Sequence, residues 1–511
     1  MNLGKANILQ FCNRNVTVIG QIDQGDAVEK ADQTTLQGKD SAMKQATLLV
    51  AVLASFMAPF IISGVNVALP SIGNEFHLNA VLLSWVAMSA TLASAMLLVP
   101  VSRFADIYGH KKVFLSGVII VLASSILAIL SGSPALLIIS RSIQGIGTAM
   151  IFGTAMAIVL SVYPLAERGK TLGIIVASTY SGLSLGPFLG GFLTDHFGWR
   201  SIFMANIPVC LVIITVVILK LQKEWAAAAG ERFDFVGSLL YSLSIFLVMY
   251  GFSSLPGLLG FVLILCGVLF VFIFIRWAGR TKLPVLNMSL FKDNKAFAFS
   301  SLAALIHYSS INAVTFLMSL YLQYIQGMSA QRAGVILVSQ PLMQTIFSPL
   351  AGRLSDKVEP RIVASTGMAL MVVNLAVFSF LSASTSIYLI IVNFIVLGFG
   401  YALFSSPNTN AAMSSVDKRM FGVASGSLGT ARSIGQVFSM GISMVVFAVF
   451  LGKEYINPSN YPVLLKSIKV LFTVFTFLSL IGVAVSLNRG NIRRKGNTFP
   501  WIDPGSPNRR A

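Results

Sequence analysis

Long apolar stretches alternate with short polar segments along most of the chain. A helix that crosses a membrane needs about 20 mostly apolar residues, because the hydrocarbon core is roughly 30 Å thick and a helix rises about 1.5 Å per residue. Fourteen stretches reach that length, and this even number predicts that both chain ends lie on the same side. The predicted spans are at about 45–70, 82–101, 113–132, 135–162, 170–194, 201–221, 234–254, 257–276, 297–322, 333–352, 362–382, 386–412, 422–450 and 468–487.

Composition supports a membrane protein and excludes a soluble globular one. Of the 511 residues, 55% are hydrophobic and only 11% are charged, and the mean hydropathy is +0.81. The three cysteines have no paired spacing, so we expect no disulfide framework, no metal site and no cofactor. Residues 1–44 are polar and lack a cleavable signal, which predicts a disordered tail.

The net charge of +18 would favour nucleic acid as a partner in a soluble protein. Of the 36 Lys and Arg, however, 29 fall on the side of the two chain ends, 5 in loops on the other side and 2 within spans. Because basic residues concentrate in cytoplasmic segments, this asymmetry predicts two cytoplasmic ends and no nucleic-acid partner. The basic cluster at 493–495 either anchors the chain or binds anionic lipid.

A polar segment recurs in the two halves of the chain. The second span is followed by SRFADIYGHKK from residue 102 and the tenth by GRLSDK from residue 352, so that Asp106 and Asp356 are 250 positions apart. Two six-span halves with an extra pair of spans between them would produce this offset, and such repeats are a transporter architecture. We predict tails at 1–44 and 489–511, bundles at 45–221 and 296–488, and the extra pair within 222–295.

The first of these segments resembles the signature of the major facilitator superfamily, Gly-x-Leu-Ala-Asp-Arg-x-Gly-Arg-Lys. Asp106, Gly109 and Lys111 match it, whereas Ser102 and His110 depart from it. The resemblance implies an all-α major facilitator fold, with two six-helix bundles and two extra helices, that acts on a small molecule bound within the bilayer.

Asp106 and its counterpart Asp356 are candidate gating residues. A carboxylate near the inner helix ends can cap the N-terminus of another helix, and a cap present in only one state would bias a gate. The alternative for Asp106 is a surface ion pair with Arg103 or Lys111.

The fifth span carries a glycine pattern that resembles the antiporter signature Gly-Pro-x-x-Gly-Gly of the same superfamily. Gly186, Pro187, Gly190 and Gly191 form the string, and Gly182 lies one turn before it. Glycines at i, i+4 and i+8 share one helix face and permit close approach of another backbone. The resemblance implies a role in conformational change; the alternative is ordinary packing of small residues.

Further motifs resemble the fourteen-span drug:proton antiporters. They include NVALP from residue 66, GWR from 198, FSSPN from 404, GVASG from 422 and ARSIGQ from 431. The resemblance implies a monomer in the plasma membrane that exports lipophilic or cationic small organic molecules by alternating access, in exchange for protons. Ile61 stands where many relatives have Asp, and no Asp or Glu falls deep in a predicted span, so proton coupling rests on the resemblance alone.

Three ionisable residues in the spans are candidates for coupling or substrate binding. Arg141 and Gln144 resemble the fourth-span signature in which the Arg is associated with proton transfer; the alternative is an Arg that reaches the outer headgroups. Arg432 allows the same two interpretations nearer the inner side. His307 in the ninth span either titrates or is a hydrogen-bonded interior residue.

Amide side chains in the spans are candidates to line an apolar pocket. Alternatives to drug export are an exporter of a specific endogenous metabolite, an uncoupled facilitator, a transporter-like sensor and a multispan lipid enzyme. The enzyme would use polar clusters such as Glu75 with His77 or Asp195 with His196, which we interpret as ordinary loop residues. The amide candidates are Asn66, Asn312, Gln340, Gln344 and Asn408.

Overall fold

The computed structural model describes residues 42–490, except 222, 287, 418–420 and 453, and its regular structure is helical. Fourteen helices of the described chain are long and apolar enough to cross a membrane, which confirms the predicted all-α fold with fourteen spans. The expected tails 1–44 and 489–511, with the basic cluster at 493–495, lie almost entirely outside the described residues. The long helices are Ala42–Phe76, α2 (Ala80–Tyr108), α3 (His110–Ile129), α4 (Pro134–Val162), α5 (Leu165–Phe197), α6 (Arg200–Lys220), α7 (Phe235–Ser253), α8 (Leu258–Ala278), α10 (Lys295–Leu320), α13 (Pro360–Phe378), α14 (Ile387–Ser414), α15 (Phe421–Phe450) and α16 (Tyr461–Leu487).

The remaining span is made of two consecutive helices, α11 (Ala330–Leu337) and α12 (Ser339–Lys357). A π-helical turn, η1 (Tyr321–Ile325), extends α10, and two short elements, α9 (Ser289–Asp293) and η3 (Pro458–Asn460), precede α10 and α16.

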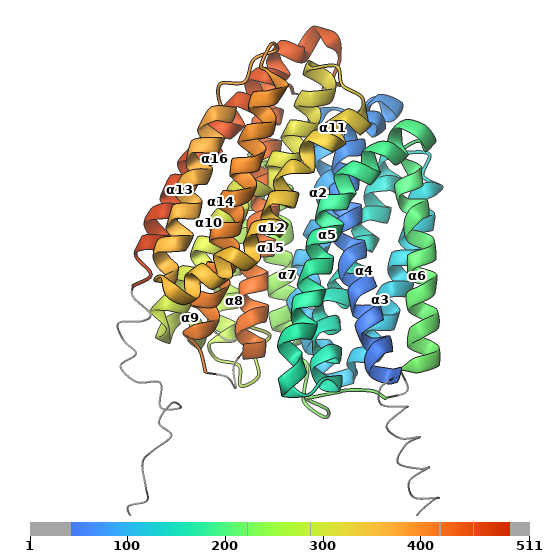
Figure 1. The fold of residues 1–511 in the computed structure, drawn as a ribbon, viewed down its shortest axis with the longest axis vertical. Helices are drawn as coiled ribbons and strands as arrows, with labels where there is room; N and C mark the ends of the chain where they lie inside the picture. Colours follow the sequence, from blue (N-terminus) through green and yellow to red (C-terminus); the bar gives the residue numbers. More distant parts are fainter. Residues whose placement is uncertain (1–41, 222, 287, 418–420, 453, 491–511) are drawn as a thin grey trace, which may run out of the picture.

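The helices gather in two sets that lie side by side (Figure 1). We call the spans within 42–220 the first set and those within 295–487 the second set. In the first set α4 packs on α2 and α3, and α3 packs on α6; in the second set α10 packs on α15 and α16, and α14 packs on α12 and α13. The extra helices α7 and α8 pack on each other, and α7 contacts α2 of the first set and α15 of the second.

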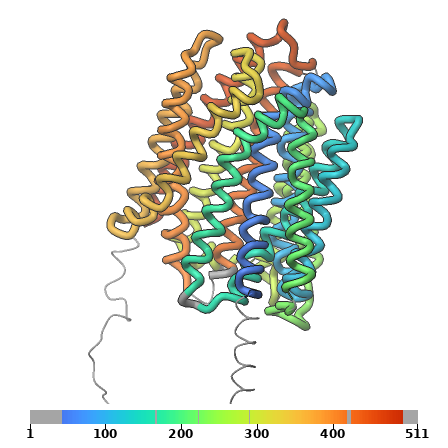
Figure 2. The backbone as a smooth tube through the Cα atoms, turned by 45° about the vertical axis from the view of Figure 1, so that its right-hand side comes forward, coloured from blue at the N-terminus to red at the C-terminus, as the bar shows by residue number. Residues whose placement is uncertain are grey.

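Both ends of the described chain lie at the same end of the molecule, the lower end in Figures 1 and 2. We call this the terminal face and the opposite end the distal face.

Glycine sets the distance between helices inside the first set. A Cβ atom on Gly145 of α4 would lie 2.1 Å from the carbonyl oxygen of Ala90 in α2, and one on Gly147 would lie 2.6 Å from that of Gly117 in α3. Real Cβ atoms are not found so close to a backbone oxygen. Helices in lipid associate through such close contacts because burial of apolar surface gives them little driving force there.

The predicted start of the last span, at about 468, is wrong. α16 begins at Tyr461, after Asn457 accepts backbone hydrogen bonds from Ser459 and Asn460, each 3.0–3.3 Å long. Lys466 and Lys469, which we predicted to lie in a loop, are therefore inside the helix. A lysine is tolerated there because its apolar stem can lie along the helix while its amine reaches the membrane edge.

Asp106 and Asp356 also lie in helices rather than in loops. Asp106 is in the last turn of α2 and Asp356 is in the last turn of α12. The polar segments that mark the repeat are thus helix ends, because polar side chains at a span's end can be solvated while the backbone remains helical.

Candidate functional site

A carboxylate joins the two helix sets at the distal face. Asp195, near the end of α5, accepts hydrogen bonds from the backbone N–H groups of Ala330 at 3.1 Å and Gln331 at 2.9 Å. These are the first residues of α11, and the N-terminus of a helix attracts a negative charge. Asp195 therefore acts as a cap supplied by the other helix set. We interpreted Asp195 as an ordinary loop residue from the sequence, so this contact was missed.

The same helices also touch through glycine. A Cβ atom on Gly191 of α5 would lie 2.4 Å from the carbonyl oxygen of Ala330, and one on Gly334 of α11 would lie 2.1 Å from that of Pro187. The two backbones are therefore in direct contact just below the Asp195 cap. Gly191 and Pro187 are the part of the predicted signature that reaches the second set.

The other glycines of the signature have a different role. Cβ atoms on Gly186 and Gly190 would lie 1.9 Å from Ser63 Oγ and 2.6 Å from Gly64 Cα, both in the first helix. These two glycines pack α5 inside the first set, as the alternative of ordinary small-residue packing proposed. The signature thus has one structural face and one face at the interface between the sets.

A second distal contact joins the first helix to η1. Gln323 donates from Nε2 to the carbonyl oxygen of Val67 at 2.8 Å, and the Tyr324 hydroxyl donates to that of Pro70 at 3.2 Å. Val67 and Pro70 belong to the NVALP motif, so this motif also lies where the two sets meet.

The terminal halves of the interface helices are open. Cβ atoms on Gly169 and Gly173 of α5, and on Gly426 and Gly429 of α15, would meet no atom within 4 Å. At its distal end α5 thus touches the second set through backbone atoms, whereas nearer the terminal face it is held by the first helix, because Ser178 donates to the carbonyl oxygen of Val52 at 2.7 Å.

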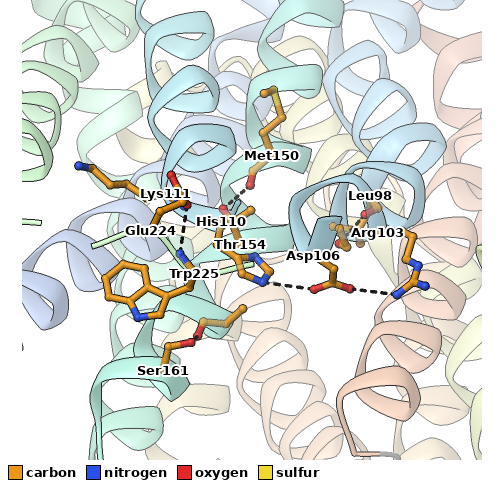
Figure 3. Close-up of polar contacts among 12 residues, drawn as sticks. Leu98, Arg103, Asp106, His110, Lys111, Met150, Thr154, Ser161, Glu224 and Trp225 are labelled. Carbon is orange, nitrogen blue, oxygen red and sulfur yellow. Dashed lines mark hydrogen bonds and ion pairs between the residues drawn. The ribbon is translucent and has the colours of Figure 1, made fainter. Parts of the chain in front are cut away.

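The junction of α2 and α3 at the terminal face holds the predicted signature. Gly109 connects the helices with a φ of +115°, a conformation that favours glycine. The Glu224 carboxylate accepts from the backbone N–H groups of Lys111 at 2.8 Å and Lys112 at 3.2 Å, and a Cβ atom on Gly109 would lie 2.5 Å from Glu224 Cδ (Figure 3). Because Gly109 has no side chain, the Glu224 carboxylate can come close enough to cap the N-terminus of α3.

Asp106 does not cap a helix here, so this expectation is not met in this state. It contacts His110 Nε2 at 3.2 Å and Arg103 Nη1 at 3.9 Å (Figure 3). The alternative of a surface ion pair with Arg103 describes it better. The cap comes instead from the segment 221–234, which precedes α7.

That segment is bound to the junction along its length. Trp225 accepts from the backbone of His110 at 2.8 Å, Ala228 donates to the carbonyl oxygen of Asp106 at 2.9 Å, and Glu231 pairs with Arg103. The extra helices are thus attached to the first set at the terminal face. Asp356, at the corresponding place in the second set, is exposed in the last turn of α12.

Arg141 is buried between α4 and α2, with 1% of its surface exposed. Nη1 donates to Gln144 Oε1, and Nε lies 3.5 Å from the carbonyl oxygen of Val86. The alternative in which Arg141 reaches the headgroups is therefore wrong, because the guanidinium is held inside the first set. Its Nη2 has no hydrogen-bond partner among the described residues.

A cluster of rings and one cation lies in the second set. His307 is fully buried, and its ring centroid is 3.9 Å from that of Phe404, 4.9 Å from that of Tyr401 and 5.1 Å from that of Tyr308. Neither ring nitrogen has a hydrogen-bond partner within residues 42–490 as described, so the expectation of a hydrogen-bonded histidine is wrong. The Arg432 guanidinium lies 5.9 Å from the Tyr308 ring centroid and donates to Thr409.

Asn408 does not line the interface between the two sets. It donates to the carbonyl oxygen of Ser300 at 3.1 Å and accepts a hydrogen bond from Arg489, all within the second set. Arg489, which we assigned to the basic tail, is buried, and burial lowers the pKa of its guanidinium to about 10. Asn408 and Arg489 therefore tie the end of α16 to α14.

The other amide candidates lie in different surroundings and do not form one pocket lining. Asn312 of α10 donates to the carbonyl oxygen of Gln436 in α15 at 3.3 Å, which joins two helices of one set. Gln340 is mostly buried where α12 meets α14. Gln344 is also buried, and its Oε1 has no partner among the described residues, whereas Asn66 is partly exposed.

Comparison with known proteins identifies a family. The model of the Major Facilitator Superfamily matches residues 51–300 and 300–502. The riboflavin transporter RibZ of Clostridioides difficile is 28% identical over 78% of this chain and 86% of its own length. The drug efflux pump JefA of Mycobacterium tuberculosis is 27% identical over 81% of this chain and 82% of its own length. The tetracenomycin C resistance and export protein of Streptomyces glaucescens is 27% identical over 80% of this chain and 77% of its own length.

A solved structure shares the fold. It is a bacterial homolog of the human lysosomal transporter Spinster, in an inward-facing and unoccupied conformation, with a TM-score of 0.64 and 15% identity. The similarity covers 88% of this chain and 97% of that one.

The glycine contact at the distal face gives the first prediction. Gly191→Ala should open this face, because the new methyl group would overlap the Ala330 backbone, and overpacking of roughly 1–3 kcal/mol shifts an equilibrium about fivefold or more. Spin labels at His196 and Arg332 should then report a longer distance than in the unsubstituted chain. Gly173→Ala, on the same helix but facing open space, is the control. Equal distances in the two variants would contradict the clamp.

The cap on α3 gives the second prediction. Glu224→Gln should lower the free energy of unfolding by about 0.5–2 kcal/mol, because it removes a charged cap from two backbone N–H groups. The measurement is thermal unfolding of the purified protein. Lys223→Gln, which changes the neighbouring exposed charge, should leave the unfolding temperature unchanged. An unaltered temperature in Glu224→Gln would show that the cap adds no stability.

Proposed function

The chain belongs to the Major Facilitator Superfamily and is a secondary transporter of a small molecule, and we propose that it exports lipophilic organic compounds in exchange for protons. The observation that carries the proposal is the asymmetric interface, in which α5 is clamped to α11 at the distal face while Gly169 and Gly173, nearer the terminal face, face open space. Such an interface is suited to alternating access, in which one clamp must break before the other forms. The family is one of transporters, so the multispan enzyme hypothesis is excluded.

We propose that the terminal face is cytoplasmic and that the protein is a monomer in the plasma membrane. The excess of Lys and Arg on the side of the chain ends supports this orientation. The terminal face would then be the side from which an exporter takes its substrate.

Export of a specific metabolite is the second candidate function. Two relatives are named for single compounds, riboflavin and tetracenomycin C, and another is named as a drug efflux pump. A broad exporter would move many unrelated lipophilic compounds, whereas a dedicated one would move one compound and its analogues. An uncoupled facilitator would move them without a pH gradient, and a transporter-like sensor would bind without moving them.

Proton coupling needs a group that titrates within the pathway. Every described Asp or Glu in a span lies within one turn of that span's end, so no carboxylate is available in the middle. His307 lies in the middle of the span Lys295–Ile325, with the rings of Tyr308, Tyr401 and Phe404 packed against it. We propose that His307 carries the proton and that Arg141 is a positioning residue for the first set.

The coupling proposal is tested in liposomes with an imposed pH gradient. Transport of a panel of lipophilic dyes and antibiotics should accelerate about tenfold when the gradient favours proton exchange. His307→Asn should lose this acceleration and keep downhill transport, since the amide cannot titrate. His196→Asn, at the exposed distal end of α5, should behave as the unsubstituted protein does. Transport that ignores the gradient would rule out proton antiport.

Arg141 gives a separate prediction. Arg141→Ala should abolish transport while the protein still inserts, because the variant removes the only charge buried between α4 and α2 within the described part of the first set. Arg141→Lys keeps a charge and should retain a fraction of the rate. Uptake of substrate into inverted vesicles, which corresponds to export from the cell, measures both variants. Full activity of Arg141→Ala would remove this residue from the mechanism.

A further inference from the structure

Far from their ends, the described spans contain positively charged side chains and no carboxylates. The carboxylates that fall within spans lie next to a span end, where water or headgroups can solvate them. Arg141 and Arg432, by contrast, lie two turns or more inside their spans. The span carboxylates are Glu75, Asp106, Glu167, Asp195 and Asp356.

This excess of positive charge affects whether a cationic or an anionic substrate is bound more favourably. Two charges interact far more strongly in a medium of low dielectric constant than in water, and an unpaired ion in the membrane is costly. A cationic substrate in the middle of the pathway would be repelled by these guanidinium groups and would find no described carboxylate there. An anionic substrate would find a partner there. A cationic substrate, which the family resemblance led us to expect, would therefore be bound less favourably than an anionic one.

Of the two arginines, Arg432 is the one placed to meet a substrate. Arg141 is fully buried inside the first set and engages Gln144 and Val86. Arg432 is partly exposed, and Gly429, one turn nearer the terminal face on the same helix, faces open space. Arg432 donates from Nη2 to Thr409, whereas its Nε has no hydrogen-bond partner among the described residues. This Nε is buried, so Arg432 keeps an unpaired donor inside the protein next to Gly429.

Two tyrosines of the second set lie next to this arginine. The Arg432 guanidinium is 5.9 Å from the ring centroid of Tyr308 of α10, and the ring of Tyr401 of α14 is 5.9 Å from that of Tyr308, edge on.

We propose that Arg432, with Tyr308 and Tyr401, forms a substrate subsite that selects planar aromatic organic anions. A guanidinium presents a planar fork that matches a carboxylate, and tyrosine rings offer faces and edges on which an aromatic ring packs. This inference rests on the proposed export function and narrows its substrate class.

Two dyes with the same xanthene ring system test the charge preference. Fluorescein is an anion and rhodamine 123 is a cation. In liposomes with the membrane potential held at zero, the unsubstituted protein should transport fluorescein and discriminate against rhodamine 123 by about tenfold or more. Arg432→Gln should lose fluorescein transport, and Arg432→Lys should retain part of it. Lys466→Gln, which removes a positive charge from an exposed position of α16, should leave fluorescein transport unchanged.

A folding defect is distinguished from a binding defect by two further measurements. The thermal unfolding temperature of Arg432→Gln should match that of the unsubstituted protein, and its affinity for fluorescein, measured by fluorescence anisotropy in detergent, should fall about tenfold. Preference for rhodamine 123, or full fluorescein transport by Arg432→Gln, would overturn the subsite while leaving the export function intact. Inactivity towards both dyes and towards the whole panel of drug-like compounds would instead overturn the proposed function.

Discussion

The hydrocarbon core cannot solvate a charge or an unpaired backbone group, and the arrangement of this protein follows from that constraint. Nearly all the ionisable side chains of the described spans lie near helix ends, and those that do not are buried or face the interface. With so few charges available, the helices hold together through close backbone contacts. Gly145 against Ala90 within the first set and Gly191 against Ala330 between the sets are the same kind of contact at two places.

These two contacts differ in what surrounds them. The contact at Gly145 lies within a continuous packed surface of α2 and α4, and this packing keeps it closed. The contact at Gly191 is reinforced by a single carboxylate, Asp195, on two backbone N–H groups, and it ends where α5 faces open space at Gly173. Since water at the distal face can replace those two hydrogen bonds, breaking this contact costs little free energy. A conformational change therefore has a natural place to start at the distal end of α5.

The sequence predicted the fold well because span length and apolar composition are local properties. It predicted helix ends less well, as Lys466 shows: a charged residue lowers the local hydropathy although the helix continues through it. It could not identify Glu224 as the cap of α3 or Ala330 as a partner of Asp195, because the two members of each contact lie more than a hundred residues apart in the chain. Glu224 reaches the α2–α3 junction only after the chain has crossed the membrane four more times. Asp195 had one local signal, its position four residues after Gly191 on the same helix face.

The extra helices are attached more firmly to the first set than to the second. The segment before α7 caps and pairs with the α2–α3 junction, and α7 itself donates from Tyr241 to the carbonyl oxygen of Ala95 at 2.9 Å and from Ser242 to that of Met96 at 2.8 Å. Towards α15, Phe252 packs edge on against Phe438, and Met249 and Phe252 lie against Gly441. Backbone carbonyls of a rigid helix fix position, whereas apolar faces can slide past each other at little cost in lipid. The pair α7–α8 should therefore move with the first set, so that a rotation between the sets shears the surface between α7 and α15 and leaves the junction around Gly109 unchanged.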